Sequence, residues 1–125
     1  SEYVFDGHIY VLVNGGSVSA ATFLAANLRR FGRATILGEE TGGTAKAFQT
    51  GTPQYIWELP NTQLQMGVSY LQLYTGYTPY TTGRGVVPDV ASAYQLNDRL
   101  AHRDLEMEKV YTLIREQEAQ QGAKP

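Results

Sequence analysis

The chain contains no cysteine and almost no imbalance of charge, and these two absences exclude several classes of protein. Without cysteine there can be no disulfide scaffold, no thiolate metal site and no cysteine nucleophile, although the cellular compartment stays open. Ten basic residues against twelve acidic ones leave a net charge of −2, so no electrostatic feature favours nucleic acid as a partner. No run is long and apolar enough to span a bilayer, and membrane association of other kinds stays undecided.

Length and composition predict one folded domain. The chain has 125 residues, of which 42% are hydrophobic, enough for one core but not for two typical domains. It begins with Ser1 rather than Met, so we expect residues 1–125 to be a fragment of a longer protein. The sequence upstream could then hold a signal, a partner domain or part of an active site.

The most informative segment joins an apolar strand to an alanine-rich helix through a short turn. Residues 8–13 lack polar–apolar alternation, which predicts a strand buried on both faces, as in a parallel sheet. The turn at residues 14–16 contains two glycines, which allow the backbone to bend sharply. Ser17 or Ser19 then lies at the start of a helix over residues 20–31, where free N–H groups favour negative charge. A serine there is either a helix cap or a nucleophile beside an oxyanion site.

A parallel crossover is the expected core of the domain. One face of the predicted helix carries Ala20, Leu24, Leu28 and Phe31, while its other alanines allow close packing. Residues 34–37 are typical of a second buried strand, so that strand, helix and strand complete a right-handed crossover. Residues 39–53, rich in glycine and threonine, are expected to form a loop at the carboxyl end of that strand.

The rest of the chain predicts a hairpin and a final helix. Residues 55–59 and 64–74 are typical of two strands separated by a turn at residues 60–62. Alternation along the second strand predicts one buried face, made by Leu64, Met66, Val68 and Tyr70. Asp104 is expected to cap the helix, whose inward stripe contains Met107, Val110, Tyr111 and Ile114.

Five ordered motifs, rather than any single one, carry a resemblance to a known family. They lie at residues 11–21, 31–43, 59–62, 83–90 and 104–106. Together they resemble the C-terminal processing (tail-specific) serine peptidases, and most closely the branch with tricorn protease and interphotoreceptor retinoid-binding protein. The resemblance implies an α/β fold with a ClpP/crotonase-like core of buried parallel strands and a crossover helix, to which a hairpin and a C-terminal helix are added. Residues 1–125 would be the C-terminal part of this catalytic domain.

The resemblance also separates the two serines of the turn. It implies that Ser19, which directly precedes Ala20 and Ala21, is the nucleophile and that Ser17 is not. A serine nucleophile needs an adjacent base, and its tetrahedral oxyanion needs fixed N–H donors. The amide of Ala20, at the helix start, is one such donor. By resemblance a second donor comes from a glycine-rich segment upstream, and no cofactor or metal is implied.

The general base is the point at which the sequence departs from the family pattern. Processing peptidases proper place a lysine where this chain has Thr44, and the nearest lysine is Lys46, which is therefore an alternative base. The tricorn-like branch uses an upstream His and a Glu, whose position here is Thr82. His8 lies at the far end of a strand, about 20 Å or more from the nucleophile. His102 precedes the last helix and is expected at the surface.

These observations predict a serine endopeptidase whose substrate is a peptide or protein and whose machinery is completed by the upstream half of the same chain. The isolated fragment is then expected to be inactive. One alternative is a catalytically silent member of the same fold that binds a peptide or an apolar ligand. Another is an acyl-CoA enzyme of the crotonase type, which the Ser19 motif disfavours. The resemblance favours a periplasmic or exported bacterial protein, and the oligomeric state stays open.

Overall fold

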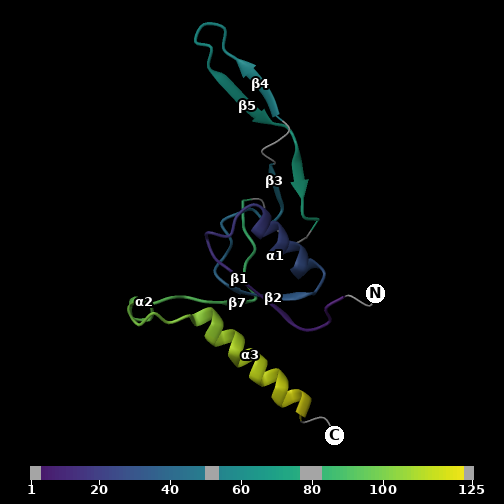
Figure 1. The fold of residues 1–125 in the computed structure, drawn as a ribbon, viewed down its shortest axis with the longest axis vertical. Coiled ribbons are helices and arrows are strands. Elements are labelled where there is room, and N and C mark those ends of the chain that lie inside the picture. Colours follow the sequence, from purple (N-terminus) through teal and green to yellow (C-terminus); the bar gives the residue numbers. More distant parts are fainter. Residues whose placement is uncertain (1–3, 50–53, 77–82, 123–125) are drawn as a thin grey trace.

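The computed structural model describes residues 4–49, 54–76 and 83–122, and Figure 1 shows how their helices and strands are arranged. The elements in chain order are β1 (Ile9–Val13), α1 (Ala20–Arg30), β2 (Ala34–Gly38), β3 (Ala47–Gln49), β4 (Gln54–Glu58), β5 (Gln65–Ser69), β6 (Gln72–Tyr74), β7 (Val90–Ala91), α2 (Leu96–Leu100) and α3 (Leu105–Gly122). None of the helices in these ranges is long and apolar enough to cross a membrane.

A small parallel sheet forms the body of the molecule. Its strand order is β1-β2-β7, with Val13 opposite Gly38 and Leu37 opposite Val90. The α1 helix connects β1 to β2, so the predicted strand–helix–strand unit is confirmed. The core between helix and sheet is made of small and branched side chains: Val13, Ala25, Ala26, Ile36, Ala45 and Val86.

The α1 helix turns a different face to the sheet from the one expected. Its buried residues are Thr22, Ala25 and Ala26, whereas Leu24 and Phe31 are exposed. Close approach to the sheet explains the difference, because small side chains let the helix backbone come near β2 while longer ones are turned outward. The larger apolar side chains of this helix therefore lie at the surface.

The prediction that β1 is buried on both faces is wrong for most of the strand, since Val13 is its one buried residue and the residues before it are half-buried or exposed. Val13 faces α1 and is buried, but Leu12, which points to the opposite face, is 42% exposed. On that face α3 makes only a marginal contact with the strand, through the Tyr10 hydroxyl, which donates to Gln117 Oε1 at 2.9 Å. In addition, β1 is an edge strand of the three-stranded sheet. One face of β1 is thus only partly covered.

The predicted hairpin is present and projects from the body (Figure 1). Strands β4 and β5 pair antiparallel, with Tyr55 opposite Val68 and Trp57 opposite Met66. Nearer the body, β3 and β6 form a second two-stranded antiparallel sheet. The expectation that one face of the hairpin is buried is wrong, because nothing in the described ranges packs against it. Its exposed side chains are Leu64, Met66, Val68 and Tyr70.

The C-terminal segment forms a short helix and a long one. Asp104 caps α3 as predicted, its Oδ1 accepting a hydrogen bond from the amide of Met107 at 3.0 Å. Of the expected inward stripe, Val110 is buried, but Tyr111 is 55% exposed. The helix extends away from the sheet (Figure 1), so only part of its apolar stripe has a surface to pack on.

Candidate active site

Three hydrogen bonds hold the turn between β1 and α1. The amide of Ser17 donates to the carbonyl of Asn14 at 2.8 Å, and the amide of Gly16 donates to Asn14 Oδ1 at 2.8 Å. The hydroxyl of Ser17 accepts from the amide of Asn14 at 3.1 Å. Ser17 therefore has a structural role, since its hydroxyl and its amide both close the turn.

Ser19 differs from Ser17 in conformation and in contacts. It occupies the N-cap position of α1 and its carbonyl accepts from the amide of Phe23 at 3.0 Å, but its side chain makes no capping hydrogen bond. Its backbone has φ 52° and ψ −119°, a region that residues other than glycine rarely adopt. The side chain is exposed. A serine with a strained backbone and a hydroxyl that makes no capping hydrogen bond thus lies directly before the start of α1.

The amide of Ala20 lies directly beside this hydroxyl, in the first position of the helix. In the described part of the chain it has no hydrogen-bond acceptor, as is usual for the first N–H groups of a helix. The amide of Ala21 donates to the carbonyl of Val18 at 3.1 Å. The structure therefore leaves Ala20 N–H available as the oxyanion donor that the sequence predicts.

The loop after β2 packs tightly against this turn. The amide of Gly43 and the hydroxyl of Thr22 both donate to the carbonyl of Ser17, at 3.2 and 2.8 Å. A Cβ on Gly43 would lie only 2.4 Å from Thr22 Oγ1 and 3.1 Å from the nitrogen of Ser19. Thr22 itself is 1% exposed. A side chain at position 43 would clash with the buried Thr22 side chain, so glycine suits this position, and the hydrogen bond from Gly43 ties the loop to the segment that carries Ser19.

An ion pair fastens the same loop to the segment before β7. The carboxylate of Glu40 accepts from Arg84 Nε at 2.8 Å, from a second Arg84 nitrogen at 2.6 Å and from the amide of Gly85 at 2.8 Å. These hydrogen bonds, those of Arg84 first, lower the pKa of Glu40 from 4.5 to about 2. The buried Thr41 adds a further link, its hydroxyl accepting from the amide of Val86 at 2.8 Å. Glu40 is therefore an ionised clamp.

The residues considered as general base are not drawn together around Ser19. Lys46 is exposed, and only its backbone carbonyl is engaged, accepting from the amide of Thr75 at 3.1 Å. In the described ranges no hydrogen bond or ion pair involves its ammonium group. His8 is exposed just before β1, at the opposite end of that strand from the turn. Thr82, the position of the family glutamate, lies outside the described residues.

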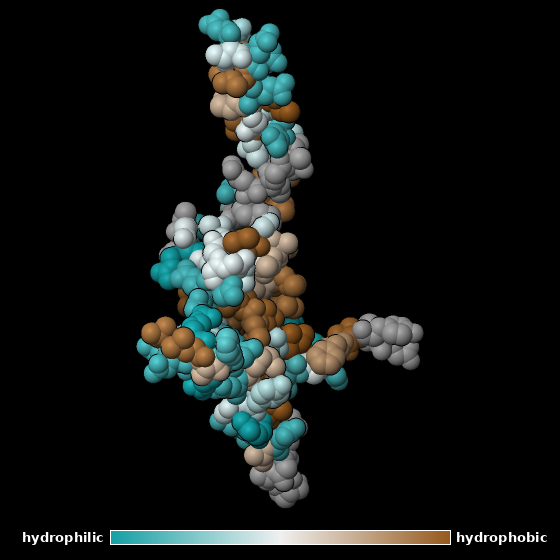
Figure 2. Space-filling view, turned by 60° about the vertical axis from the view of Figure 1, so that its left-hand side comes forward, coloured by the Kyte–Doolittle hydropathy of each residue, from teal (hydrophilic) through white to brown (hydrophobic). Residues whose placement is uncertain are grey.

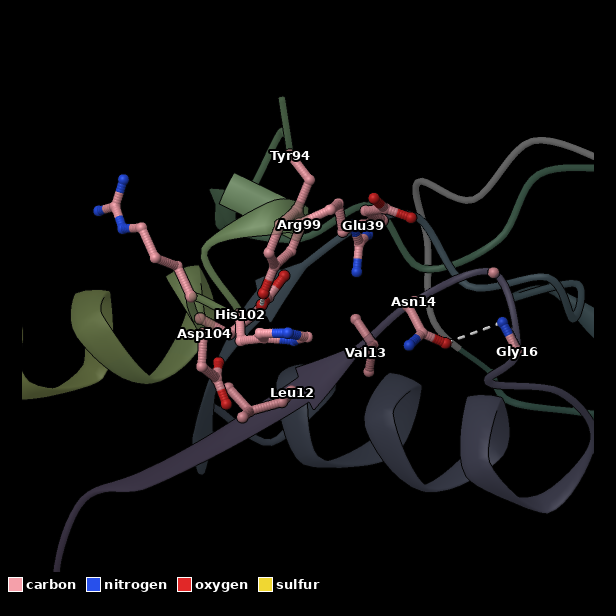
Figure 3. Close-up of a pocket in the computed structure, with 12 residues that line it drawn as sticks. Leu12, Val13, Asn14, Gly16, Glu39, Tyr94, Arg99, His102 and Asp104 are labelled. Atoms are coloured by element: carbon pink, nitrogen blue, oxygen red, sulfur yellow. Dashed lines mark hydrogen bonds between the residues drawn. The ribbon is translucent and has the colours of Figure 1, made fainter. Parts of the chain in front are cut away.

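His102 lines a pocket that sequence reasoning did not find. The pocket measures about 850 Å³ and lies between the carboxyl end of β1 and the segment joining α2 to α3. In Figure 3 the ring of His102 projects toward Val13, and the side chain of Asn14 lies at the other end of the opening. The other lining residues are Leu12, Gly15, Gly16, Glu39, Tyr94, Arg99, Arg103, Asp104 and Glu106. No local motif links positions so far apart in the sequence.

Most charged groups of this pocket are already paired. Arg103 forms ion pairs with Asp98 at 2.7 Å and with Glu108. The hydroxyl of Tyr94 donates to Glu106, which together with partial burial raises the pKa of that tyrosine. The guanidinium of Arg99 lies 3.7 Å from the centre of the Tyr94 ring. Within the described ranges no group of three His, Cys, Asp or Glu residues could hold a metal ion.

Comparison with known protein families gives a match for the part of the chain that contains the Ser19 turn. Residues 1–92 match peptidase family S41, a span that includes the parallel sheet, α1 and the projecting hairpin. A comparison with curated proteins found no match.

Solved structures agree with the observed fold. The crystal structure of a candidate peptidase from Parabacteroides merdae ATCC 43184 aligns with a TM-score of 0.52 at 24% sequence identity. The alignment covers 87% of this chain and 32% of that one, so the present chain spans about a third of its length. At this identity the likeness establishes the fold alone. The family match, by contrast, covers well over half of the sequence, and the chain therefore belongs to peptidase family S41, as the resemblance to C-terminal processing peptidases implied.

Proposed function

We propose that this chain supplies the nucleophile of a serine peptidase and that Ser19 attacks the carbonyl carbon of a peptide bond. The observation that carries the proposal is the backbone of Ser19, with φ 52° and ψ −119° at a strand–turn–helix junction. Such conformations cost about 1–3 kcal/mol and are concentrated at functional sites. A sharp, strained turn of this kind is also how another class of serine hydrolase presents its nucleophile.

Ser19 is favoured over Ser17 as the nucleophile because the two hydroxyls differ in their hydrogen bonds. The Ser17 hydroxyl closes the turn by accepting from the amide of Asn14, whereas the Ser19 hydroxyl makes no capping bond. The hydroxyl of an ordinary N-cap serine accepts a hydrogen bond from a backbone N–H in the first turn of the helix. Ser19 makes no such bond, so helix capping does not account for a strained serine at this position. The free, exposed hydroxyl has the availability that a nucleophile needs.

The reaction follows from these positions. The Ser19 oxygen attacks the carbonyl carbon while its proton passes to a base, and a tetrahedral oxyanion forms. The amide of Ala20 and the N-terminus of α1 stabilise that negative charge. Collapse of the intermediate expels the amine and leaves an acyl-enzyme on Ser19, which water then hydrolyses. The substrate class is a peptide or protein, with the tail-specific mode of cleavage as the family-based expectation.

The remaining parts of the machinery are assigned to the preceding half of a longer protein. A second oxyanion donor and a general base are both needed, and an upstream His is the favoured base. Lys46 is the alternative, but it is exposed, and lysines act as bases where burial disfavours their charged form. That the present chain spans only about a third of a structural neighbour is in keeping with this division. An exported or periplasmic location stays a prediction.

Labelling with a fluorophosphonate probe tests the assignment. In the longer protein, Ser19→Ala should abolish labelling and peptide hydrolysis, while Ser17→Ala and Lys46→Ala should each retain most of both. The isolated 125-residue chain should hydrolyse no peptide, because losing even one oxyanion donor typically costs about 10²–10³ in turnover. Labelling that persists in Ser19→Ala would refute the nucleophile. Absence of labelling in an intact, folded longer protein would favour the silent, ligand-binding alternative.

A further inference from the structure

Thr22 makes a hydrogen bond that a threonine in a helix does not ordinarily make. It lies in the first turn of α1, where a threonine hydroxyl commonly donates to the carbonyl three or four residues before it. The Thr22 hydroxyl instead donates to the carbonyl of Ser17, five residues before it, at 2.8 Å. The bond therefore leaves the helix and ends in the turn between β1 and α1. It closes a short loop of chain that contains Ser19.

Hydrophobic burial alone does not explain why Thr22 points inward. Thr22 shares the buried face of α1 with Ala25 and Ala26, while Leu24 on the same helix is 57% exposed. Figure 2 shows that hydrophobic side chains lie at the surface of the body. Burying a hydroxyl is unfavourable unless a hydrogen bond compensates for the lost water. The inward direction of Thr22 therefore depends on its bond to the Ser17 carbonyl.

Gly43 covers this hydrogen bond on its other side. Its amide donates to the same Ser17 carbonyl at 3.2 Å, so one donor comes from α1 and one from the loop after β2. A Cβ at position 43 would lie 2.4 Å from Thr22 Oγ1 and 3.1 Å from the nitrogen of Ser19. Gly43 thus lies against both residues. Because Thr22 is only 1% exposed, water does not compete for its hydroxyl, which strengthens the bond.

The backbone of Ser19 needs restraints on both of its sides. A conformation such as φ 52° and ψ −119° persists only where surrounding contacts hold it. On the C-terminal side, the Ser19 carbonyl accepts from the amide of Phe23 at 3.0 Å. On the N-terminal side, the carbonyl of Ser17 is held by the Thr22 hydroxyl. Without that bond the chain before Ser19 can relax, which changes the position of the Ser19 oxygen relative to the Ala20 amide.

We propose that Thr22 is a positioning residue that holds Ser19 in its strained conformation and thereby sets the rate at which this serine reacts. The inference rests on the proposed role of Ser19 as the nucleophile. Thr22 is buried and acts through the Ser17 carbonyl, so its hydroxyl affects the chemical step rather than the binding of a substrate. Misplacement of a reacting group by about 1 Å can lower a rate about 100-fold.

Substitution of Thr22 in the longer protein tests the proposal. Thr22→Val keeps the shape and removes the hydroxyl, while the Ser17 carbonyl still accepts from Gly43, so the turn should stay folded. The maximal rate of labelling by a fluorophosphonate probe should fall about 10- to 100-fold, while the half-saturating probe concentration should change less than about threefold. Thr22→Ser retains the hydroxyl and should keep the labelling rate within about threefold of the wild type.

Thr75→Val is the matched control. Thr75 is 2% exposed, and its hydroxyl likewise donates to a backbone carbonyl, that of Ala45, at 2.6 Å. This variant should lower the melting temperature about as much as Thr22→Val, but its labelling rate should stay within about threefold of the wild type. Thr22→Cys, whose thiol is a weak donor, should give an intermediate rate and serves as the test if Thr22→Val does not fold.

The outcomes separate this inference from the proposed function. An unchanged labelling rate in Thr22→Val, or an equal loss in both valine variants, would overturn the positioning role even where Ser19→Ala abolishes labelling. A low rate in Thr22→Ser would do the same, because the hydroxyl is then not what matters. If Ser19→Ala is still labelled, or the wild type is not, the proposed nucleophile fails and this inference fails with it.

Discussion

The α/β body and the projecting hairpin use their apolar side chains in opposite ways. In the body, small residues such as Ala25 and Ala26 are fully buried and bring α1 close to the sheet. In the hairpin, seven larger apolar residues lie on one face and are all exposed. The body therefore has a core of its own, whereas within the described ranges the hairpin is held by cross-strand pairs alone. The candidate site and the buried core both lie in the body.

The two regions also differ in how closely their backbones approach. In the body, glycines stand where chains touch: a Cβ on Gly38 would lie 2.1 Å from the carbonyl oxygen of Val13, and Gly38 has φ +117°. In the hairpin, a Cβ on Gly67 would meet only the tip of the flexible Gln54 side chain. The same substitution should therefore have very different effects in the two places.

The largest predicted effect comes from substituting these two glycines. Gly38→Ala combines a positive φ with a backbone clash and should lower the free energy of unfolding by at least about 3 kcal/mol. Gly67→Ala should change it by less than about 1 kcal/mol, because alanine suits a strand interior better than glycine does. Urea denaturation followed by far-UV circular dichroism measures both. Similar losses in the two variants would mean that the hairpin is as tightly packed as the body.

A smaller effect is expected where the body itself is strained. Ser19→Gly should leave the free energy of unfolding unchanged or raise it by up to about 1 kcal/mol, since glycine adopts φ 52° without penalty and no capping bond is lost. Ser17→Gly should lower it by about 1 kcal/mol, because the bond from the amide of Asn14 disappears. The same denaturation measurement applies. A clear loss of stability in Ser19→Gly would contradict a strained, disengaged serine.

The smallest effect concerns the exposed clamp between Glu40 and Arg84. The pKa of Glu40 is lowered to about 2 in the folded chain, so its contribution is present above the ordinary value of 4.5 and is lost as the pH falls toward 2. Glu40→Gln should therefore flatten the acid side of the stability curve in this window. Added salt should reduce the difference, as for other surface pairs. An unchanged acid limb, measured as the urea midpoint against pH, would rule out the clamp.

Local sequence pattern predicted β1, α1, β2, the hairpin and α3, because each is specified by neighbouring residues, but it did not predict β3 or α2 and it merged β5 and β6 into one strand. The apolar run before residue 14, the alanines of α1 and the turn at Pro60 lie beside the structures they encode. The sequence pattern could not predict whether another part of the structure packs against an apolar face. The hairpin face, Leu12 and Tyr111 were all expected to be buried, and all are exposed. An amphipathic pattern indicates which face of an element is apolar, but it does not indicate which other element covers that face.

The same limit applies to the candidate site. Ser19 and Ala20 could be named because they adjoin the strand, and their catalytic roles stay predictions. The clamp between Glu40 and Arg84 joins positions 44 residues apart, and the His102 pocket joins two distant segments. No spacing rule brings such residues together, since only the packed chain does. The tricorn-like branch and the ClpP/crotonase type of core also stay predictions.

The hydrogen bond from Thr22 to the carbonyl of Ser17 has a consequence for motion around the site. Thr22 lies in the first turn of α1, and the carbonyl it binds also receives the amide of Gly43. Fraying of that helical turn would therefore release the Ser19 turn and the glycine loop in one step. Segments linked in this way exchange their amide hydrogens as one cooperative unit. The surface residues around Ser19 should thus open as rarely as the helix behind them, and not as often as an independent loop.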